Sequence, residues 1–305
     1  MRRWAALGAV CAAAVLLAGC GLGPGATPAA VTLTVTRNFG ATAIKPRSPL
    51  QVKGQETVMS LLMRNYDVHT EYAGGFVQSI DGHAGAPQAS PPVAWFYYVN
   101  GVEAPKGASA TNVVSGDSIW WDLHQWGAAE GTPAVVGSFP EPFRNGIAGK
   151  RYPVRVECAP GAQQACQTVA TSLQRYAIPA AVAGATGGSQ PDTLRIIVGA
   201  VRELDYEGTV RSLESGPRVS GVYAWLTATS LTTLDEAGKA VARYGPGSGV
   251  IAATVQDGEP PVWIVAGTDA AGTERAAADF NEKALRDHFA LAVTPAGSQA
   301  LPVAG

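Results

Sequence analysis

The chain has 305 residues, 47% of them hydrophobic, and a formal net charge of −2. Its 22 basic residues form no run, so nucleic acid and anionic lipid headgroups are poor candidates as partners. This length is typical of two folded domains, and the low charge with abundant apolar residues argues against a disordered stalk.

The N-terminus has the pattern of a bacterial lipoprotein signal. Arg2 and Arg3 precede a short apolar stretch from Trp4 to Leu17, and Leu17-Ala18-Gly19-Cys20 follows at its end. We expect residues 1–19 to be a signal peptide, Cys20 to carry the lipid, and residues 20–30 to be a tether. The mature protein would then lie on the extracytoplasmic face of the cell membrane. The alternative is an ordinary secreted protein with an incidental Cys20.

Residues 31–126 indicate a small β-rich domain with one short helix. Strands are expected where β-branched or aromatic residues alternate or end at a turn dipeptide such as Asp81-Gly82 or Asn100-Gly101. The helix has Val58, Leu61 and Leu62 at helical spacing, with Thr57 as N-cap. The expected elements are strands at 31–36, 74–80, 93–99 and 118–126 and a helix at 57–65.

Residues 127–150 are rich in Gly, Ala and Pro and indicate a linker or strap. Residues 151–295 then alternate strand and helix, which favours an α/β sandwich, so the whole chain is expected to be α+β. Residues 296–305 are expected to be a tail. The expected elements are strands at 154–158, 194–198, 219–234 and 249–265 and helices at 163–176, 207–214 and 270–288.

Two cysteines remain once Cys11 leaves with the signal peptide and Cys20 carries lipid. Cys158 and Cys166 are eight positions apart, and in an exported protein such an isolated pair indicates a disulfide. A metal site is the alternative, but it would need further ligands, and no His or other Cys is near in the sequence. We therefore expect no metal.

No motif of catalysis is present, so we expect a binding protein and not an enzyme, with no resident cofactor. The Gly-rich segments lack a phosphate-binding ending, and no Ser lies in a nucleophile elbow. The four histidines are scattered; His124 lies among three tryptophans, where a packed or solvated residue is the plainer interpretation.

Both faces of the aromatic strands carry large side chains. Alternation places Trp95, Tyr97, Trp121 and Leu123 on one apolar face, which we expect to pack against the helix. A domain with one helix can cover only one face, so the second must meet the other domain, a partner or a ligand. We expect an open binding surface there; a sheet buried on both sides within the chain is the alternative. The candidate ligand-binding residues are Phe96, Tyr98, Trp120 and Trp126, with Tyr72 and Phe76 as weaker candidates nearby.

Several of these segments resemble a known family. The run Trp95–Gly101, then Gly116–Trp121, with Thr57–Leu62 and Gly75–Gly82 upstream, is similar to the transcobalamin-like C-terminal domain of bacterial surface proteins. The resemblance covers about residues 31–126. It implies cobalamin or a related corrinoid as the ligand, which animal carriers hold between this domain and a helical barrel. Residues 127–305 do not resemble that barrel.

Two functional hypotheses follow from the resemblance and the aromatic face. The first is a lipoprotein that captures a corrinoid and delivers it to an importer, such as an energy-coupling-factor transporter. The second is a structural or adaptor lipoprotein whose aromatic face docks the C-terminal domain or another protein. If the face is open, Trp120→Ala should leave folding nearly intact, whereas Trp121→Ala should destabilise the domain.

Overall fold

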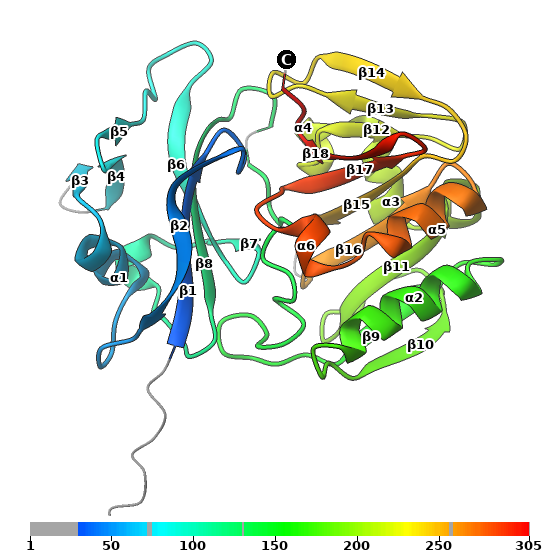
Figure 1. Cartoon of the computed structure of the whole chain (residues 1–305), viewed down its shortest axis with the longest axis horizontal. Coiled ribbons are helices and arrows are strands. Elements are labelled where there is room, and N and C mark those ends of the chain that lie inside the picture. Colours follow the sequence, from blue (N-terminus) through cyan, green and yellow to red (C-terminus); the bar gives the residue numbers. More distant parts are fainter. Residues whose placement is uncertain (1–29, 72–74, 130, 256–258, 305) are drawn as a thin grey trace, which may run out of the picture.

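The computed structural model describes residues 30–71, 75–129, 131–255 and 259–304, and these fold as two domains joined by a strap (Figure 1). The expected signal peptide, Cys20, the tether up to residue 29 and Tyr72 lie outside the described residues, and Ala30, expected to end the tether, is the first residue of β1. Within the described ranges, no helix has the length and apolar character needed to cross a membrane.

The first domain is built on a five-stranded sheet in the order β2-β1-β8-β6-β7. Its central pair, β1 and β8, is parallel, and the other neighbours are antiparallel. A small sheet, β3-β4-β5, lies beside it (Figure 1). The elements are β1 (Ala30–Arg37), β2 (Thr42–Gln51), α1 (Val58–Asn65), β3 (Val68–Glu71), β4 (Phe76–Ile80), β5 (His83–Ala84), β6 (Val93–Val99), β7 (Val102–Glu103) and β8 (Ser118–Gln125).

Helix α1 covers one face of this sheet. Its N-cap is Thr57, whose side chain accepts from the Ser60 amide, as the sequence predicts. The buried residues Leu61 and Leu62 share one core with a set of strand side chains. That set includes Trp95, Tyr97, Trp121 and Leu123, so the predicted assignment of this face is confirmed.

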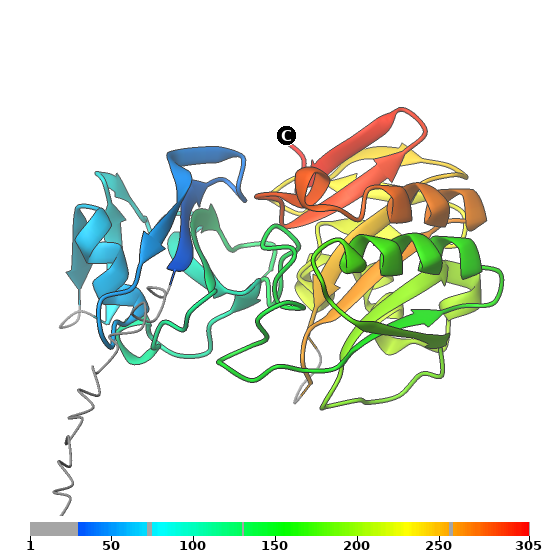
Figure 2. The same ribbon diagram turned by 60° about the horizontal axis from the view of Figure 1, so that its bottom comes forward.

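The second domain is an α/β sandwich around a seven-stranded sheet, in the order β10-β9-β11-β16-β15-β17-β18. The first four strands are parallel and the last three antiparallel. Helices α2 and α5 lie side by side against the sheet (Figures 1 and 2). The predicted α+β fold is confirmed. The elements are β9 (Val154–Cys158), α2 (Gln163–Gln174), β10 (Ala180–Gly184), β11 (Leu194–Ala200), α3 (Gly208–Ser212), α4 (Pro217–Ser220), β12 (Ala224–Leu226), β13 (Leu231–Leu234), β14 (Ala240–Tyr244), β15 (Gly249–Thr254), β16 (Val262–Gly267), α5 (Ala270–Ala278), α6 (Glu282–Leu285), β17 (Ala290–Thr294) and β18 (Gly297–Leu301).

Four expected elements differ in the structure. The expected strand at 249–265 is two antiparallel strands, β15 and β16. The expected tail contains β18, which pairs with β17 and so completes the sheet. The expected strand at 219–234 contains the end of α4 and two antiparallel strands, β12 and β13. The expected helix at 270–288 is divided, because the Asn281 side chain accepts from the Ala284 amide and starts a new helix, α6.

Within residues 127–150, the described residues 127–129 and 131–150 form a strap that packs between the domains. Val135, Val136, Phe139 and Phe143 are buried in the same core as the second domain's sheet. Backbone hydrogen bonds tie the strap to the first domain, from Val135 N–H to Gly101 and from Glu103 N–H to Pro133. The segment is therefore part of the interface and not a free linker.

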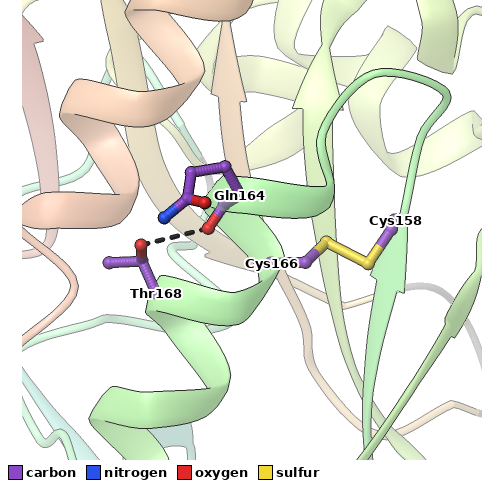
Figure 3. Close-up of a disulfide and its surroundings, with 4 residues drawn as sticks. All are labelled: Cys158, Gln164, Cys166 and Thr168. Carbon is purple, nitrogen blue, oxygen red and sulfur yellow. Dashed lines mark hydrogen bonds between the residues drawn. A yellow bond between two sulfur atoms is a disulfide. The ribbon is translucent and has the colours of Figure 1, made fainter.

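The predicted disulfide between Cys158 and Cys166 is confirmed (Figure 3). It joins the end of β9 to the first turns of α2, with the two Cα atoms 6.0 Å apart. Nearby in α2, the Thr168 hydroxyl donates to the Gln164 carbonyl at 3.1 Å (Figure 3). The bond fixes α2 against the strand it follows.

Breaking this disulfide should lower the free energy of unfolding by about 2–3 kcal/mol, because it closes a short loop in the unfolded chain. Urea unfolding of the Cys158→Ala/Cys166→Ala double variant measures the loss. Treating that variant with a thiol reductant is the control, and it should change nothing further. A double variant as stable as the wild type would contradict the prediction.

Candidate functional site

The candidate binding face lies at the boundary between the domains. Tyr98 on β6 is directly opposite Trp120 on β8, and Phe96 is opposite Asp122, so the register places these side chains together. Tyr98 and Trp120 are both 0% exposed, and both belong to the core of the second domain. The expectation of an open surface is therefore wrong for these two residues, because the C-terminal domain covers them.

Phe289, just before β17, is the centre of this contact. Its ring centroid lies 5.1 Å from those of Phe39 and Trp120, 5.3 Å from His124 and 5.5 Å from Tyr98, all in edge-on geometry. Edge-on aromatic pairs of this kind contribute beyond their buried area. We call the side chains of Phe39, Phe96, Tyr98, Trp120 and His124, together with Phe289 and Tyr223, the aromatic interface.

The remaining candidates have separate positions. Phe96 is half-buried and stacks on His124, with ring centroids 4.4 Å apart, at the margin of the aromatic interface. Trp126 lies one residue beyond β8 and is half-buried, with its backbone N–H bonded to the Pro92 carbonyl. Phe76 is half-buried on β4, in the small sheet. The structure thus brings together Phe96, Tyr98 and Trp120 but leaves Phe76 in another sheet.

Asp122 is a fully buried carboxylate that organises the aromatic interface. Oδ1 accepts from the Phe39 amide and from His124 Nδ1, both at 2.9 Å. Oδ2 accepts from the Gly40 amide at 2.9 Å and from the Thr36 hydroxyl. Trp120 Nε1 donates in turn to Thr36 Oγ1 at 2.6 Å. Two backbone amides, the Thr36 hydroxyl and His124 thus satisfy this buried carboxylate within the protein.

The β1–β2 turn reaches the second domain at this point. Phe39 and Gly40 both have positive φ, of 56° and 83°, and the two Asp122 bonds hold them there. A Cβ on Gly40 would lie 1.9 Å from the Asp287 carbonyl oxygen. Only glycine permits so close an approach of the two domains.

Polar contacts surround the aromatic interface. Arg47 on β2 forms an ion pair with Asp287 at 2.8 Å and donates to the Gly137 carbonyl of the strap. Asn100 donates to the Gly146 carbonyl at 2.8 Å. Burial raises the pKa of the Tyr98 and Tyr223 phenols, so both remain neutral at physiological pH.

Sequence patterns could not identify Phe39, Phe289, Tyr223 or the roles of Asp122 and Thr36. Phe39 is in a turn, and Phe289 and Tyr223 lie far along the chain in segments without a clear periodicity. One signal was available: Asp122 and His124 share the face of Trp120 by alternation, and a charged residue on an aromatic face needs a buried partner.

Stability should fall as pH rises through neutrality, owing to Glu103. Burial raises the pKa of this carboxyl, next to the strap at Thr132, to about 7. An unfolded glutamate titrates near about 4.3. Between these two pKa values the folded state holds a proton that the unfolded state has released. The stability that this proton contributes is therefore fully present below the unfolded pKa and is lost as the pH rises towards 7. We expect a loss of about 1–3 kcal/mol between pH 5 and 8, measured by urea unfolding.

Glu103→Gln is the matched variant, because it keeps the shape and removes the titration. It should be more stable than the wild type at pH 8 and show a shallower pH dependence. Burial also raises the pKa of Asp117 and Glu141, so the variant should keep some slope of the same sign. An unchanged slope in Glu103→Gln would contradict the assignment.

A second buried charge cluster lies in the C-terminal domain. Arg195 is 2% exposed and bonds to Glu157 at 2.7 Å and to Glu207 at 3.1 Å. Glu157 also accepts from Gln190, so these groups satisfy one another. Within the described ranges, no three His, Cys, Asp or Glu side chains are placed to hold a metal ion.

Comparison with known proteins places one segment in a family. Residues 55–125 match the family described as "Domain of unknown function (DUF4430)". This segment runs from the start of α1 to the end of β8, so it includes both aromatic strands. No curated protein matches the sequence.

Among solved structures, the chain is similar to the crystal structure of "a putative metal binding protein" from Ruminococcus gnavus ATCC 29149. The two are 17% identical, with a TM-score of 0.25. The match covers 32% of this chain and 96% of that chain.

Proposed function

We propose that this chain is an extracytoplasmic lipoprotein, anchored through Cys20, whose first domain holds the C-terminal domain in a fixed position. It is thus a structural or adaptor protein, and its aromatic face is the docking surface. The supporting observation is that Tyr98 and Trp120 are fully buried against Phe289 and Tyr223 of the same chain. An apolar interface of this kind opposes free relative motion of two domains.

Removing the Phe289 ring tests this role, because Phe289 belongs to the second domain and touches four rings of the first. In Phe289→Ala the domains should separate more often, and the strap at residues 127–150 should become cleavable by a protease at low concentration. Trp225→Ala is the control, since Trp225 is 36% exposed on β12. Equal cleavage of both variants and the wild type would argue against a docking role.

Anchoring is tested at Cys20. Cys20→Ala should move the protein from the membrane fraction into the medium or periplasm, because the acyl chains would be lost. Tight membrane association of that variant would contradict the lipoprotein assignment. It would not contradict the proposed docking role of the first domain.

Corrinoid capture is the second candidate. Its support is the resemblance of residues 31–126 to the transcobalamin-like domain, together with a second domain that faces the same aromatic strands. A corrinoid on Trp120 would have to displace Phe289, whose ring centroid is 5.1 Å away. Titration of the wild-type protein with cyanocobalamin, followed by tryptophan fluorescence, decides between the two. Saturable binding would favour capture for an importer, and no binding would favour docking alone.

A further inference from the structure

A groove crosses the boundary between the domains, away from the aromatic interface. Its first part is a cavity of about 420 Å³ with walls from β1 and β2, the strap and the second domain. Its second part, about 480 Å³, shares Arg144, Asn145 and Tyr176 with the first and continues along the strap. We call the two together the interdomain groove.

Positive charge without a partner gathers in this groove. Arg144 and Arg151 are exposed, and neither forms an ion pair or a side-chain hydrogen bond with any described residue. Among the described residues, they are the only Asp, Glu, Lys, Arg or His side chains that line the second part. The net charge of the whole chain is negative, so this local excess of arginine is not a consequence of composition.

The acidic residues of the first part have partners already. The Glu141 carboxylate accepts from Asn145 twice, at 2.6 Å from Nδ2 and 2.8 Å from the backbone amide. Glu282 pairs with Arg286 at 3.0 Å. Neither carboxylate forms an ion pair with Arg144, although the Arg144 charge acts on Glu141 and opposes the rise in its pKa that burial causes.

Two buried hydroxyls also line the first part. Ser118 is 5% and Ser138 2% exposed, and their Oγ atoms have no hydrogen-bond partner within the described ranges. A buried hydroxyl without a partner is costly, so such groups usually meet a water or a ligand. One serine comes from β8 and the other from the strap, so a single ligand could bridge the two.

We propose that the interdomain groove binds a small anion, carrying a carboxylate or phosphate group, in its first part, through Arg144 with the two serine hydroxyls as further donors. Arg151 adds positive charge in the second part, which also includes Arg144. Planar guanidinium groups and hydroxyls are the donors that suit these oxygen anions. The donors in the first part come from β8 and the strap, and Tyr176 and Glu282 of the second domain complete its wall, so the whole site is present only when the domains are docked. It is separate from any corrinoid on the aromatic face.

The probes are inorganic phosphate and succinate, added to the purified chain at constant ionic strength with chloride as the reference. Each should raise the melting temperature in a saturable manner, because the ligand binds only the folded state. Losing one charge-assisted contact should weaken binding about tenfold or more in Arg144→Gln. Ser138→Ala should weaken it less. Arg243→Gln, an exposed arginine on β14, is the matched control and should bind as the wild type does.

Vesicles of phosphatidylcholine with and without phosphatidylglycerol distinguish the source of the anion. Binding to phosphatidylglycerol vesicles that depends on Arg144, without a response to the soluble anions, would assign the groove to a lipid headgroup. Saturable binding of phosphate or succinate would assign it to a soluble metabolite. No saturable binding of any probe, or equal binding by Arg144→Gln and the wild type, would overturn the proposal.

Discussion

Trp120→Ala is expected to lower the free energy of unfolding by about 3–5 kcal/mol, the usual cost of removing a large aromatic side chain from a core. Trp120 is 0% exposed and packs on Tyr98 and Phe289. Its Nε1 also donates to Thr36, so the variant loses a buried hydrogen bond as well as the contacts. Urea unfolding monitored by circular dichroism measures the change. This expectation replaces the near-neutral effect that an open aromatic face would give.

Trp121→Ala and Trp225→Ala are the two reference variants for Trp120→Ala, one in a core and one near the surface. Trp121 is 2% exposed in the core under α1, so its removal should cost a similar amount. Trp225 is 36% exposed, so its loss should cost far less. A near-wild-type midpoint for Trp120→Ala, with Trp121→Ala strongly destabilised, would mean that the C-terminal domain does not cover the aromatic face in solution.

Strand alternation predicted the two faces of the first sheet but not what covers the second. Side chains on β6 and β8 alternate because of backbone geometry alone, so Trp95 and Trp121 could be placed under α1 from the sequence. What faces Trp120 depends on Phe289, which is 169 positions away in the chain. A contact between residues so far apart in the chain leaves no periodic pattern in the sequence around either residue.

In the second domain, strongly apolar strands were predictable and weakly patterned ones were not. β9 and α2 begin where expected, because Val154 and Val156 and the 3.6-residue spacing of α2 are clear signals. β10 is made of Ala, Val and Gly, and β18 of Gly, Ser, Gln, Ala and Leu, which have weak strand preference. Pairing with β9 and β17 determines their conformation.

Local backbone features explain where α4 and α5 end. Pro217 at the first turn and Gly221 in the left-handed region limit α4 to four residues, the last two of which lie in the stretch expected to be a strand. Phe280 turns inward to the core between α5 and α6, which divides the expected long helix. Neither feature changes hydrophobic periodicity enough to be seen without the fold.

The candidate site was predictable in part. Alternation and antiparallel pairing group Phe96, Tyr98 and Trp120 on one face, and these residues lie on one face in the structure. The interdomain groove was not predictable, because Arg144 of the strap and Ser118 of β8 are far apart in the chain and line the same cavity only in the folded protein.

Asp122→Ala is expected to cost about 3–5 kcal/mol of stability, because it removes the acceptor of four donors, three of them buried. The Phe39 and Gly40 amides, the Thr36 hydroxyl and His124 Nδ1 would all lose that partner, and only Gly40 among them is part-exposed. The left-handed turn at Phe39 would then lose its restraint, and Phe39 would leave Phe289 and Tyr223.

Asp192→Ala is the matched control, because this aspartate is 83% exposed in its surface pair with Lys150. An exposed pair of this kind contributes about 0–1 kcal/mol. Beyond the loss of stability, Asp122→Ala should make the strap at residues 127–150 cleavable under native conditions, since the turn connects the two domains. A variant that loses little stability and keeps the strap protected would show that the aromatic rings dock the domains without the carboxylate. Loss of stability with the strap still protected would assign Asp122 to the first domain's own folding, and the docking role would then rest on Phe289.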